Sequence, residues 1–440
     1  MKPTGLMLAT GVLVVLGGTV WYFNKHPKVE TPATPPSPKV LSVPEDQIEA
    51  IRLAKTGSDP IVLKKLADKW VIAEPKQMPA DQDAVKSLTG SLSSLGSDRL
   101  IDDHPASLTD FGLSTPGEEV DITKKGGAVD KLLIGSDTPS GSDTYVKLES
   151  KPAVYTVASS TKSSFDKAVN DLRDKRLMPF DSDKVTAVTV TSKGPAFSFG
   201  KNAQGEWQIV KPSPMRADAS QADDLVRKLK DAKMDTAATD DAKKMDADFA
   251  SGTNVGTATV TDNSGPYTIT IHQAKDKTYY AKSSVVEGVY KLAGDLGDGL
   301  KDKDVDSFRN KKLFDFGFND PSKLDLNGAV YQKSGDKWNG PSGLVDAGSV
   351  QSVIDKLRDL SATKFADKMA GSQVLAVAVT SGDKNKFEKL IINKAGDSFD
   401  AQRDGEPSVY VIESKSLEDL QKAISGIKPY VAPKTDTKKK

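Results

Sequence analysis

Hydrophobic and polar residues alternate along several short segments of the chain, and this pattern predicts β-strands. The alternation begins in Ile48 to Leu53. Further strands are predicted at Ile61 to Leu66, Trp70 to Ile72, Val120 to Thr123, Lys131 to Ile134, Tyr145 to Leu148 and Val154 to Val157. Because the segments are short and closely spaced, they favour a mostly antiparallel sheet with helices packed on a face.

Helical spacing replaces the alternation after Pro75, which ends the first group of strands. Asp81 can accept hydrogen bonds from the first turn of a helix. The apolar residues that follow recur at intervals of three and four, at Val85, Leu88, Leu92 and Leu95. One apolar stripe of this kind predicts a helix that packs against the sheet.

A second helix is predicted to begin near Ser163, with Asp166 as its capping-box partner, and to end at Arg173 to Arg176. Ser416 and Asp419 have the same spacing near the end of the chain. Basic residues are favourable at the C-terminal end of a helix, because the helix dipole is negative there.

The same pattern returns 137 residues later without a gap. The residues shared by the two copies include Trp70 and Trp207, Pro75 and Pro212, Met78 and Met215, and Asp81 and Asp218. Agreement of a tryptophan and a methionine in one register indicates an internal repeat.

The downstream half repeats at 135 residues, which aligns Tyr145 with Tyr280. A shorter third copy retains Lys337-Trp338, Asp346-Ala347 and Val409 to Ile412. The sequence therefore predicts an α+β protein with three tandem repeated modules, at residues 41–177, 178–312 and 313–430.

An uncharged stretch, Gly5 to Phe23, precedes the modules. As a helix it would span about 28 Å, close to the hydrocarbon core of a bilayer. We predict one uncleaved transmembrane helix, with residues 1–29 as anchor and flank. A cleaved signal peptide is the alternative, although no Ala-x-Ala site follows the apolar run.

Residues 30–40 are rich in proline and predict a stiff, extended linker. Residues 431–440 form a basic tail that ends in three lysines. Lysines flank the apolar stretch on both sides, so the positive-inside count does not decide its orientation. A short N-terminal tail before a large folded portion suits a signal-anchor with extracytoplasmic, periplasmic modules.

The amino-acid composition excludes several classes of partner and of reactive site. The chain has 61 basic and 61 acidic residues, and this balance argues against nucleic acid as a partner. It has no cysteine, which excludes disulfides, thiol nucleophiles and thiolate metal sites.

A set of short motifs resembles one bacterial family, catalogued as domain of unknown function 4340. The motifs are Lys69-Trp70, Ala80-Asp81, Asp110-Phe111-Gly112-Leu113, Leu133-Ile134-Gly135, Thr138-Pro139, Gly141, Tyr145 and Val154 to Val157. The likeness covers Leu41 to about Tyr430, although copies two and three lack Phe-Gly-Leu and the Thr-Pro turn. It implies a membrane-anchored accessory of gliding-motility-type ABC transporters, and it defines no catalytic or ligand residues.

Candidate chemistry is sparse. The three histidines, His26, His104 and His272, lie far apart, and no Gly-x-Ser-x-Gly or phosphate-binding glycine motif occurs. Asp302, Asp304 and Asp306 alternate as in a calcium loop, but Ser307 and Leu313 replace its glycine and glutamate.

These three aspartates are therefore read as the start of a helix. The basic clusters Arg173 to Arg176 and Arg309 to Lys312 are read as helix C-termini. The tryptophans Trp70, Trp207 and Trp338 are read as core residues that bury against the first helix of each module.

We predict no enzyme, and no catalytic, cofactor-binding or metal-binding residue. The favoured interpretation is a non-enzymatic, membrane-anchored scaffold or accessory protein of a bacterial envelope complex, single-pass in the inner membrane. Its expected partners are the lipid bilayer, through the N-terminal helix, and proteins of a membrane complex. The alternatives are an envelope polysaccharide or lipid-binding module and an undetected hydrolase.

Overall fold

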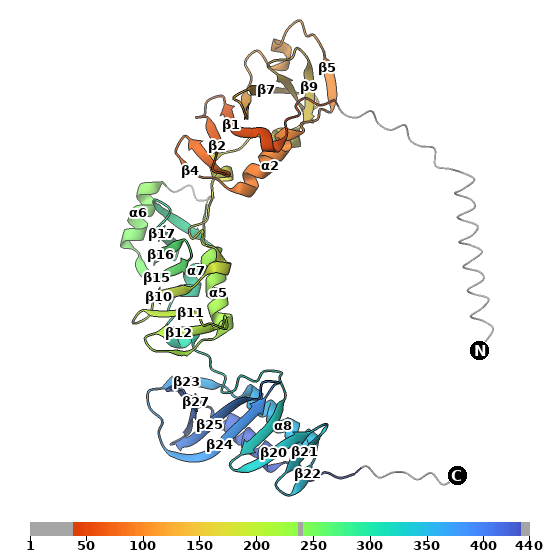
Figure 1. Cartoon of the computed structure of the whole chain (residues 1–440). Coiled ribbons are helices and arrows are strands. Elements are labelled where there is room, and N and C mark those ends of the chain that lie inside the picture. The colour runs from red at the N-terminus through yellow and green to blue at the C-terminus, as the bar shows by residue number, and fades with distance from the viewer. Residues whose placement is uncertain (1–37, 236–240, 433–440) are drawn as a thin grey trace, which may run out of the picture. The chain divides into compact units, whose positions relative to one another are not determined.

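The computed structural model describes residues 38–235 and 241–432 (Figure 1). They form two compact units, one ending at Asp174 and the other beginning at Lys175. The first unit contains one nine-stranded antiparallel sheet and the second contains two. We refer to residues 38–174, 175–310 and 311–430 as the first, second and third modules.

The first module contains nine strands and three α-helices. The strands are β1 (Ile48–Lys55), β2 (Ile61–Leu66), β3 (Lys69–Glu74), β4 (Met78–Pro79), β5 (Arg99–Asp102), β6 (Glu118–Lys124), β7 (Val129–Asp137), β8 (Asp143–Leu148) and β9 (Val154–Ala158). The helices are α2 (Gln82–Ser93), α3 (Ser159–Lys162) and α4 (Val169–Leu172), with 3-10 turns η1 (Glu45–Gln47) and η2 (Thr109–Phe111).

The second module repeats this order of strands. Its strands are β10 (Ala187–Thr191), β11 (Phe197–Lys201), β12 (Trp207–Lys211), β13 (Met215–Arg216), β14 (Lys233–Met234), β15 (Thr253–Asp262), β16 (Gly265–Gln273), β17 (Tyr279–Ser283) and β18 (Val289–Ala293). Its helices are α5 (Ala219–Lys230), α6 (Ala242–Ser251) and α7 (Leu296–Leu300), with 3-10 turns η3 (Ser182–Lys184) and η4 (Val305–Phe308).

The third module also has nine strands. They are β19 (Pro321–Leu326), β20 (Ala329–Ser334), β21 (Lys337–Gly340), β22 (Gly343–Val345), β23 (Ala362–Ala366), β24 (Ser372–Ser381), β25 (Lys386–Ala395), β26 (Ser398–Arg403) and β27 (Val409–Ile412). Its helices are α8 (Ala347–Asp359) and α9 (Ser414–Ser425).

One strand order is common to the three sheets. In the first it is β4-β3-β2-β1-β6-β7-β8-β9-β5, and the other two sheets repeat it with their own strands. Two antiparallel meanders are therefore joined where the first strand pairs with the sixth, as β1 does with β6. The sheets fit a tandem repeat of one module, and their antiparallel pairing confirms the predicted architecture.

Each first helix begins at an aspartate, as its local sequence predicts. Asp81 accepts hydrogen bonds from the backbone N–H groups of Asp83 and Ala84 at the start of α2. Asp218 and Asp346 cap α5 and α8 in the same way. The apolar stripe of α2 is buried at Val85, Leu88 and Leu92, and these helices therefore cover one face of each sheet.

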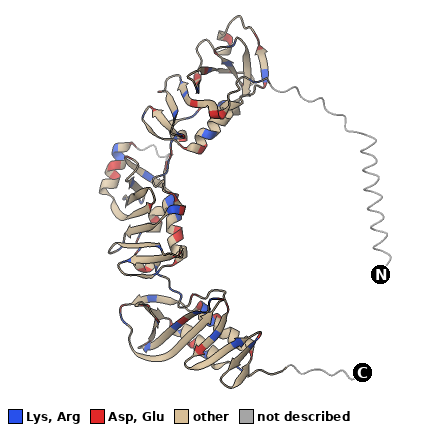
Figure 2. Ribbon diagram, viewed as in Figure 1, with Lys and Arg blue, Asp and Glu red and all other residues tan. Residues whose placement is uncertain are grey.

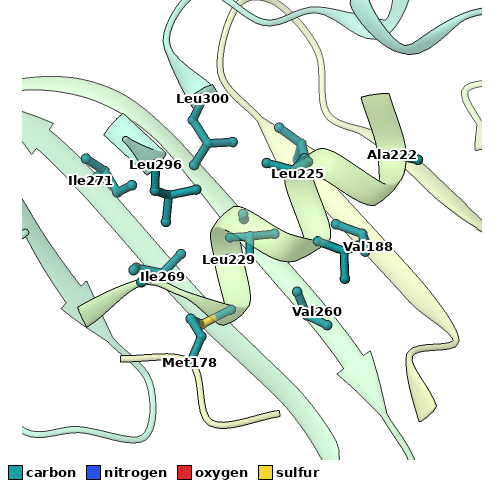
Figure 3. Packing of buried hydrophobic residues seen from close by; sticks show 14 of the residues in the cluster. Met178, Val188, Ala222, Leu225, Leu229, Val260, Ile269, Ile271, Leu296 and Leu300 are labelled. Atoms are coloured by element: carbon teal, nitrogen blue, oxygen red, sulfur yellow. The ribbon is translucent and has the colours of Figure 1, made fainter. Parts of the chain in front are cut away.

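The core of the second module shows this packing directly (Figure 3). Leu225 and Leu229 of α5 lie against Val188, Val260 and Ile269 of the sheet. Leu296 and Leu300 of α7 close the same cluster. All of these side chains are buried, so burial of apolar area is the main force that holds helix to sheet.

The predicted last helix is wrong in the first module. Ser163 follows α3, Asp166 hydrogen-bonds to Lys55, and Arg173 has extended backbone after α4. Two helices of four residues therefore replace one long helix, because Asp166 serves a long-range ion pair and not a cap. In the third module α9 does form, but Glu413 precedes it and Asp419 pairs with Lys415.

Adjacent modules are linked by extended segments, residues 173–177 and 309–313, which we call the connectors. In the first connector the N–H of Asp174 bonds to Pro79, whereas the N–H of Leu177 bonds to Ala232. In the second connector the N–H of Asn310 bonds to Arg216 and that of Leu313 to Leu360. The backbone hydrogen bonds of the chain thus change from one module to the next after Asp174 and after Asn310. Both positions lie slightly before the ends of the predicted modules, at residues 177 and 312.

No helix in residues 38–235 or 241–432 combines the length and the apolar character needed to span a bilayer. The anchor predicted at Gly5 to Phe23 lies outside the described residues, as do most of the linker and of the basic tail.

Candidate functional site

A group of ionisable side chains lies between the second and third sheets, and we call it the junction cluster. It contains Arg216 from β13, Asp315 after the second connector, and Glu388, Arg403, Glu406 and Tyr410 from β25 to β27. Two backbone features fix the position of Arg216. It lies in the two-residue edge strand β13, and its carbonyl accepts a hydrogen bond from the N–H of Asn310.

Arg216 reaches from the second module to the third. Its Nη1 lies 2.6 Å from Asp315 Oδ1, and its Nε lies 3.1 Å from Glu406 Oε1. Its Nη2 donates to the Tyr410 hydroxyl at 3.0 Å. A planar guanidinium suits this role, since it can donate in several directions at once.

Arg403 shares Asp315 and Glu406 with Arg216 and also binds Glu388. Its Nη2 lies 3.0 Å from Glu388 Oε1, its Nε 2.9 Å from Glu406 Oε1, and its Nη1 donates to the Leu313 carbonyl at 2.9 Å. The side chains of Arg403 and Glu388 are only 10% and 3% exposed. Within the described residues, Glu388 Oε2 has no hydrogen-bond partner.

Within the junction cluster, the basic and acidic side chains neutralise one another. Burial raises the pKa of the Tyr410 phenol, and the charge of Arg216 opposes that rise. Burial by itself would lower the pKa of Arg216, but the nearby Asp315 and Glu406 outweigh it and the pKa is raised. Arg216 therefore stays charged, and the carboxylates accept hydrogen bonds from both arginines. Groups engaged in this way hold two modules together and are poorly placed for acid–base chemistry.

The basic clusters of the sequence lie in the connectors and not at the C-termini of long helices. Arg309 places its guanidinium 3.5 Å from the centre of the Phe365 ring and also pairs with Asp306. Arg309 directly follows η4 as its C-terminal cap, so the interpretation as a helix C-terminus holds for Arg309. It does not hold for residues 310–312, which cross from one sheet to the next.

The three aspartates resembling a calcium loop do not converge. Asp304 caps η4, where its Oδ1 accepts from the N–H of Ser307, and Asp306 pairs with Arg309. Asp302 has a left-handed backbone conformation in the preceding turn. The start of a short helix is confirmed. Across the described ranges, no group of three His, Asp or Glu side chains is arranged to hold a metal ion.

The tryptophans lie in the cores, as predicted. Trp207 donates from its indole nitrogen to Asp223 of α5 at 2.7 Å, and Trp338 is buried in the third core. Trp70 is half-buried, and its backbone bonds to Gln82 of α2.

Of the histidines, His26 lies outside the described residues and His104 is exposed beside Asp103. His272 lies on β16, where its Nδ1 is 2.7 Å from the carbonyl oxygen of Phe249 and its ring stacks on the Phe249 ring. His272 therefore helps to attach α6 to the sheet.

The Asp110 to Leu113 motif holds a loop on the outer side of the first sheet. Phe111 packs edge-on against Tyr145, and Leu113 is buried against Leu133. A Cβ atom at Gly135 would lie 2.2 Å from the Phe111 carbonyl oxygen, so only glycine fits there. The motif is therefore a packing device.

The other modules attach the same segment differently. His272 and Asn393 occupy the register position of Gly135, three residues beyond Ile269 and Leu390. His272 bonds to the carbonyl of Phe249, and the Asn393 side chain donates to that of Gly371 at 3.2 Å. In all three modules, the residue at this position therefore contacts a backbone carbonyl of the segment that joins the fifth strand of the module to the sixth.

Positive and negative residues are interspersed over each module (Figure 2). This pattern, three sheets of one topology and a buried ionic junction define the chain as a tandem-repeat protein of antiparallel sheet modules.

Comparison with known families identifies the particular repeat. The family described as Domain of unknown function (DUF4340) matches residues 70–250 and 207–373, two overlapping regions that together extend over more than half of the chain. The chain belongs to this family. Comparison with curated proteins and with solved structures gave no match.

The junction cluster was not found from the sequence. Arg216 occupies the repeat position of Pro79, and Arg403 that of Ser283. A charged residue that replaces a small or apolar one at an aligned repeat position is the signal that would have indicated it.

Proposed function

We propose that this chain is a non-enzymatic scaffold or accessory protein of a bacterial envelope complex, anchored in the inner membrane by residues 5–23 and associated with an ABC transporter. The transporter association rests on the family resemblance. We further propose that the third module is a diverged third copy of the family domain, because it repeats the strand order of the other two.

The observation that carries the scaffold proposal is the use of charge at the junction cluster. Two arginines and three carboxylates are engaged with one another between two sheets. A protein that must present separate sheets in a fixed order needs such contacts, whereas an enzyme needs groups left ready for a substrate.

The proposal is tested by separating the anchor from the modules. A fragment from Leu41 onward should fold and yet fail to complement loss of the full chain. Exchange of residues 1–29 for an unrelated single-span helix should restore function. Complementation by the unanchored fragment would contradict the requirement for membrane attachment.

The proposal that the chain has no catalytic site is tested in the same complementation assay. Ala substitutions at His104, His272 and Asp304 should leave activity within a few-fold of the parent chain. Abolished activity in a folded variant would indicate a catalytic site. Site-specific cross-linking from the sheet surfaces should then capture a transporter subunit; capture of lipid or polysaccharide alone would favour the binding-module alternative.

A further inference from the structure

A cleft opens at one end of the first module, where β1 ends and β2 and β6 begin. Its volume is about 410 Å³. Leu53, Ile61 and Val169 supply apolar walls, and the backbone after α3 closes one side. This volume lies in the range of pockets that hold small molecules.

The carboxylate of Glu118 lies in this cleft. Glu118 begins β6, and its side chain lies on the same face of the strand as the core residues Val120 and Ile122. The residue is only 6% exposed. In the described part of the chain its carboxylate makes no hydrogen bond and no ion pair, because the nearby Lys55 binds Asp166 at 2.8 Å instead.

A carboxylate on a mostly buried side chain, without a partner of its own, is costly, so its presence requires a reason. Burial raises the pKa of Glu118, and the charge of Asp166 raises it further. The charges of Lys55 and Lys162 act in the opposite direction. Of the charged residues that line the cleft, Lys55 is bound to Asp166, so Glu118 is the mostly buried carboxylate left to receive a cation.

The repeat provides an internal comparison. The register positions of Glu118 are Gly256 in the second module and Leu375 in the third, two residues before Ala258 and Val377. A Cβ atom at Gly256 would lie 2.8 Å from the Thr191 carbonyl oxygen, so this position has no room for a side chain. Leu375 is buried in its core.

The apolar wall differs as well. Phe197 takes the place of Ile61 in the second module, where it is buried and packs against Phe308. The fold thus does not need an acid or an open space at this position, and the first module has both.

We propose that the cleft of the first module binds a small aliphatic amine, whose ammonium group pairs with Glu118 while its hydrocarbon part contacts Leu53, Ile61 and Val169. This inference is independent of the scaffold role and adds a ligand to it. Recognition would combine a charge-assisted hydrogen bond with burial of apolar area.

The test uses the full-length chain in maltoside micelles, with leucine and valine methyl groups labelled for NMR. On titration with n-butylamine hydrochloride at neutral pH, the methyl signals of Leu53 and Val169 should shift and saturate, with a Kd of about 1–10 mM for so small a ligand. 1-Butanol and sodium chloride at matched concentration should not reproduce the shifts.

Two variants decide the role of the cleft. Glu118→Gln keeps the shape and removes the charge, and it should weaken binding at least about tenfold, the value of one charged hydrogen bond. Glu119→Gln is the matched control, because Glu119 lies on the opposite face beside Lys131, and it should leave the Kd within about twofold.

Ile61→Phe introduces the residue of the second module, keeps Glu118 and should abolish binding by filling the cleft. Unchanged binding by either Glu118→Gln or Ile61→Phe would overturn the proposal. So would the absence of saturable shifts in the parent chain, or equal shifts with 1-butanol.

Discussion

The second and third modules share a strand order and a set of backbone contacts, yet they hold their connectors by different chemistry. In the second module the Ser283 hydroxyl donates to the carbonyl of Leu177 at 2.6 Å. In the third module the Arg403 guanidinium donates to the equivalent carbonyl of Leu313 and also binds Glu388, Asp315 and Glu406. The backbone contact is retained, while the side chain that makes it has changed from a neutral hydroxyl to a charged group.

This comparison teaches that the repeat conserves the packing of each module and leaves its edges free to diverge. The cores are built from the same helix and strands, whereas the edges can carry a charge-dependent connection. Substitutions in the core should therefore have similar effects in the two modules, and substitutions at the edges should not.

The largest effect is expected in the cores. Trp338→Ala should destabilise the third module by about 4 kcal/mol, because a large buried side chain is lost and a cavity remains. Trp207→Ala should cost the second module a similar amount. Hydrogen exchange read peptide by peptide should show loss of protection confined to the altered module; equal loss in all three modules would contradict modular packing.

Arg403→Met should destabilise the third module by about 3 kcal/mol, since it leaves Glu388 buried without its arginine. Arg227→Met is the matched control, because it removes an exposed ion pair on α5 and should cost less than about 1 kcal/mol. Urea unfolding of the full chain, followed by exchange of the β23 to β27 peptides, measures both. An Arg403 variant as stable as the control would show that the junction cluster contributes little.

Ser283→Ala should cost the second module about 1.5 kcal/mol. The change removes the bond to Leu177 and the bond that the hydroxyl accepts from Val285 N–H, but it leaves no buried charge. A loss of stability smaller than that of Arg403→Met, measured by the same unfolding experiment, would distinguish the edge held by the Ser283 hydroxyl from the edge held by the Arg403 guanidinium. A loss as large as that of Arg403→Met would remove the distinction.

The smallest effect concerns the first module and has the opposite sign. Glu118→Leu introduces the residue of the third module and should stabilise the first module by about 1 kcal/mol at pH 7. The pKa of Glu118 is raised in the folded state by burial, so stability from its protonated form is present below the ordinary glutamate pKa and is lost as pH rises through the raised value.

The advantage of Glu118→Leu should therefore shrink as pH falls from 7 toward the ordinary glutamate pKa. Exchange of the β1 and β6 peptides as a function of pH measures this, with Glu119→Gln as the control. A pH-independent difference would mean that Glu118 does not titrate differently on folding.

The sequence by itself determined the local features of this protein. The aspartate caps of α2, α5 and α8 act within three residues, and both they and the seven strands predicted from alternation in the first module are confirmed. The short strands β4 and β5 were not predicted. The repeat was visible because aligned tryptophans fill equivalent cores. The helix predicted after Ser163 failed because its capping residue, Asp166, bonds instead to Lys55, which lies 111 residues away.

Only the tertiary structure decided which distant side chains meet. Arg216 binds Asp315 and Tyr410, which follow it by 99 and 194 residues, and no local pattern encodes such pairs. The same holds for the outer position of β5 beside β9 and for the empty space around Glu118, which depends on the size of Ile61. Local hydrogen bonds and periodic burial are written in neighbouring residues, whereas contacts across sheets depend on the register and packing of the whole module.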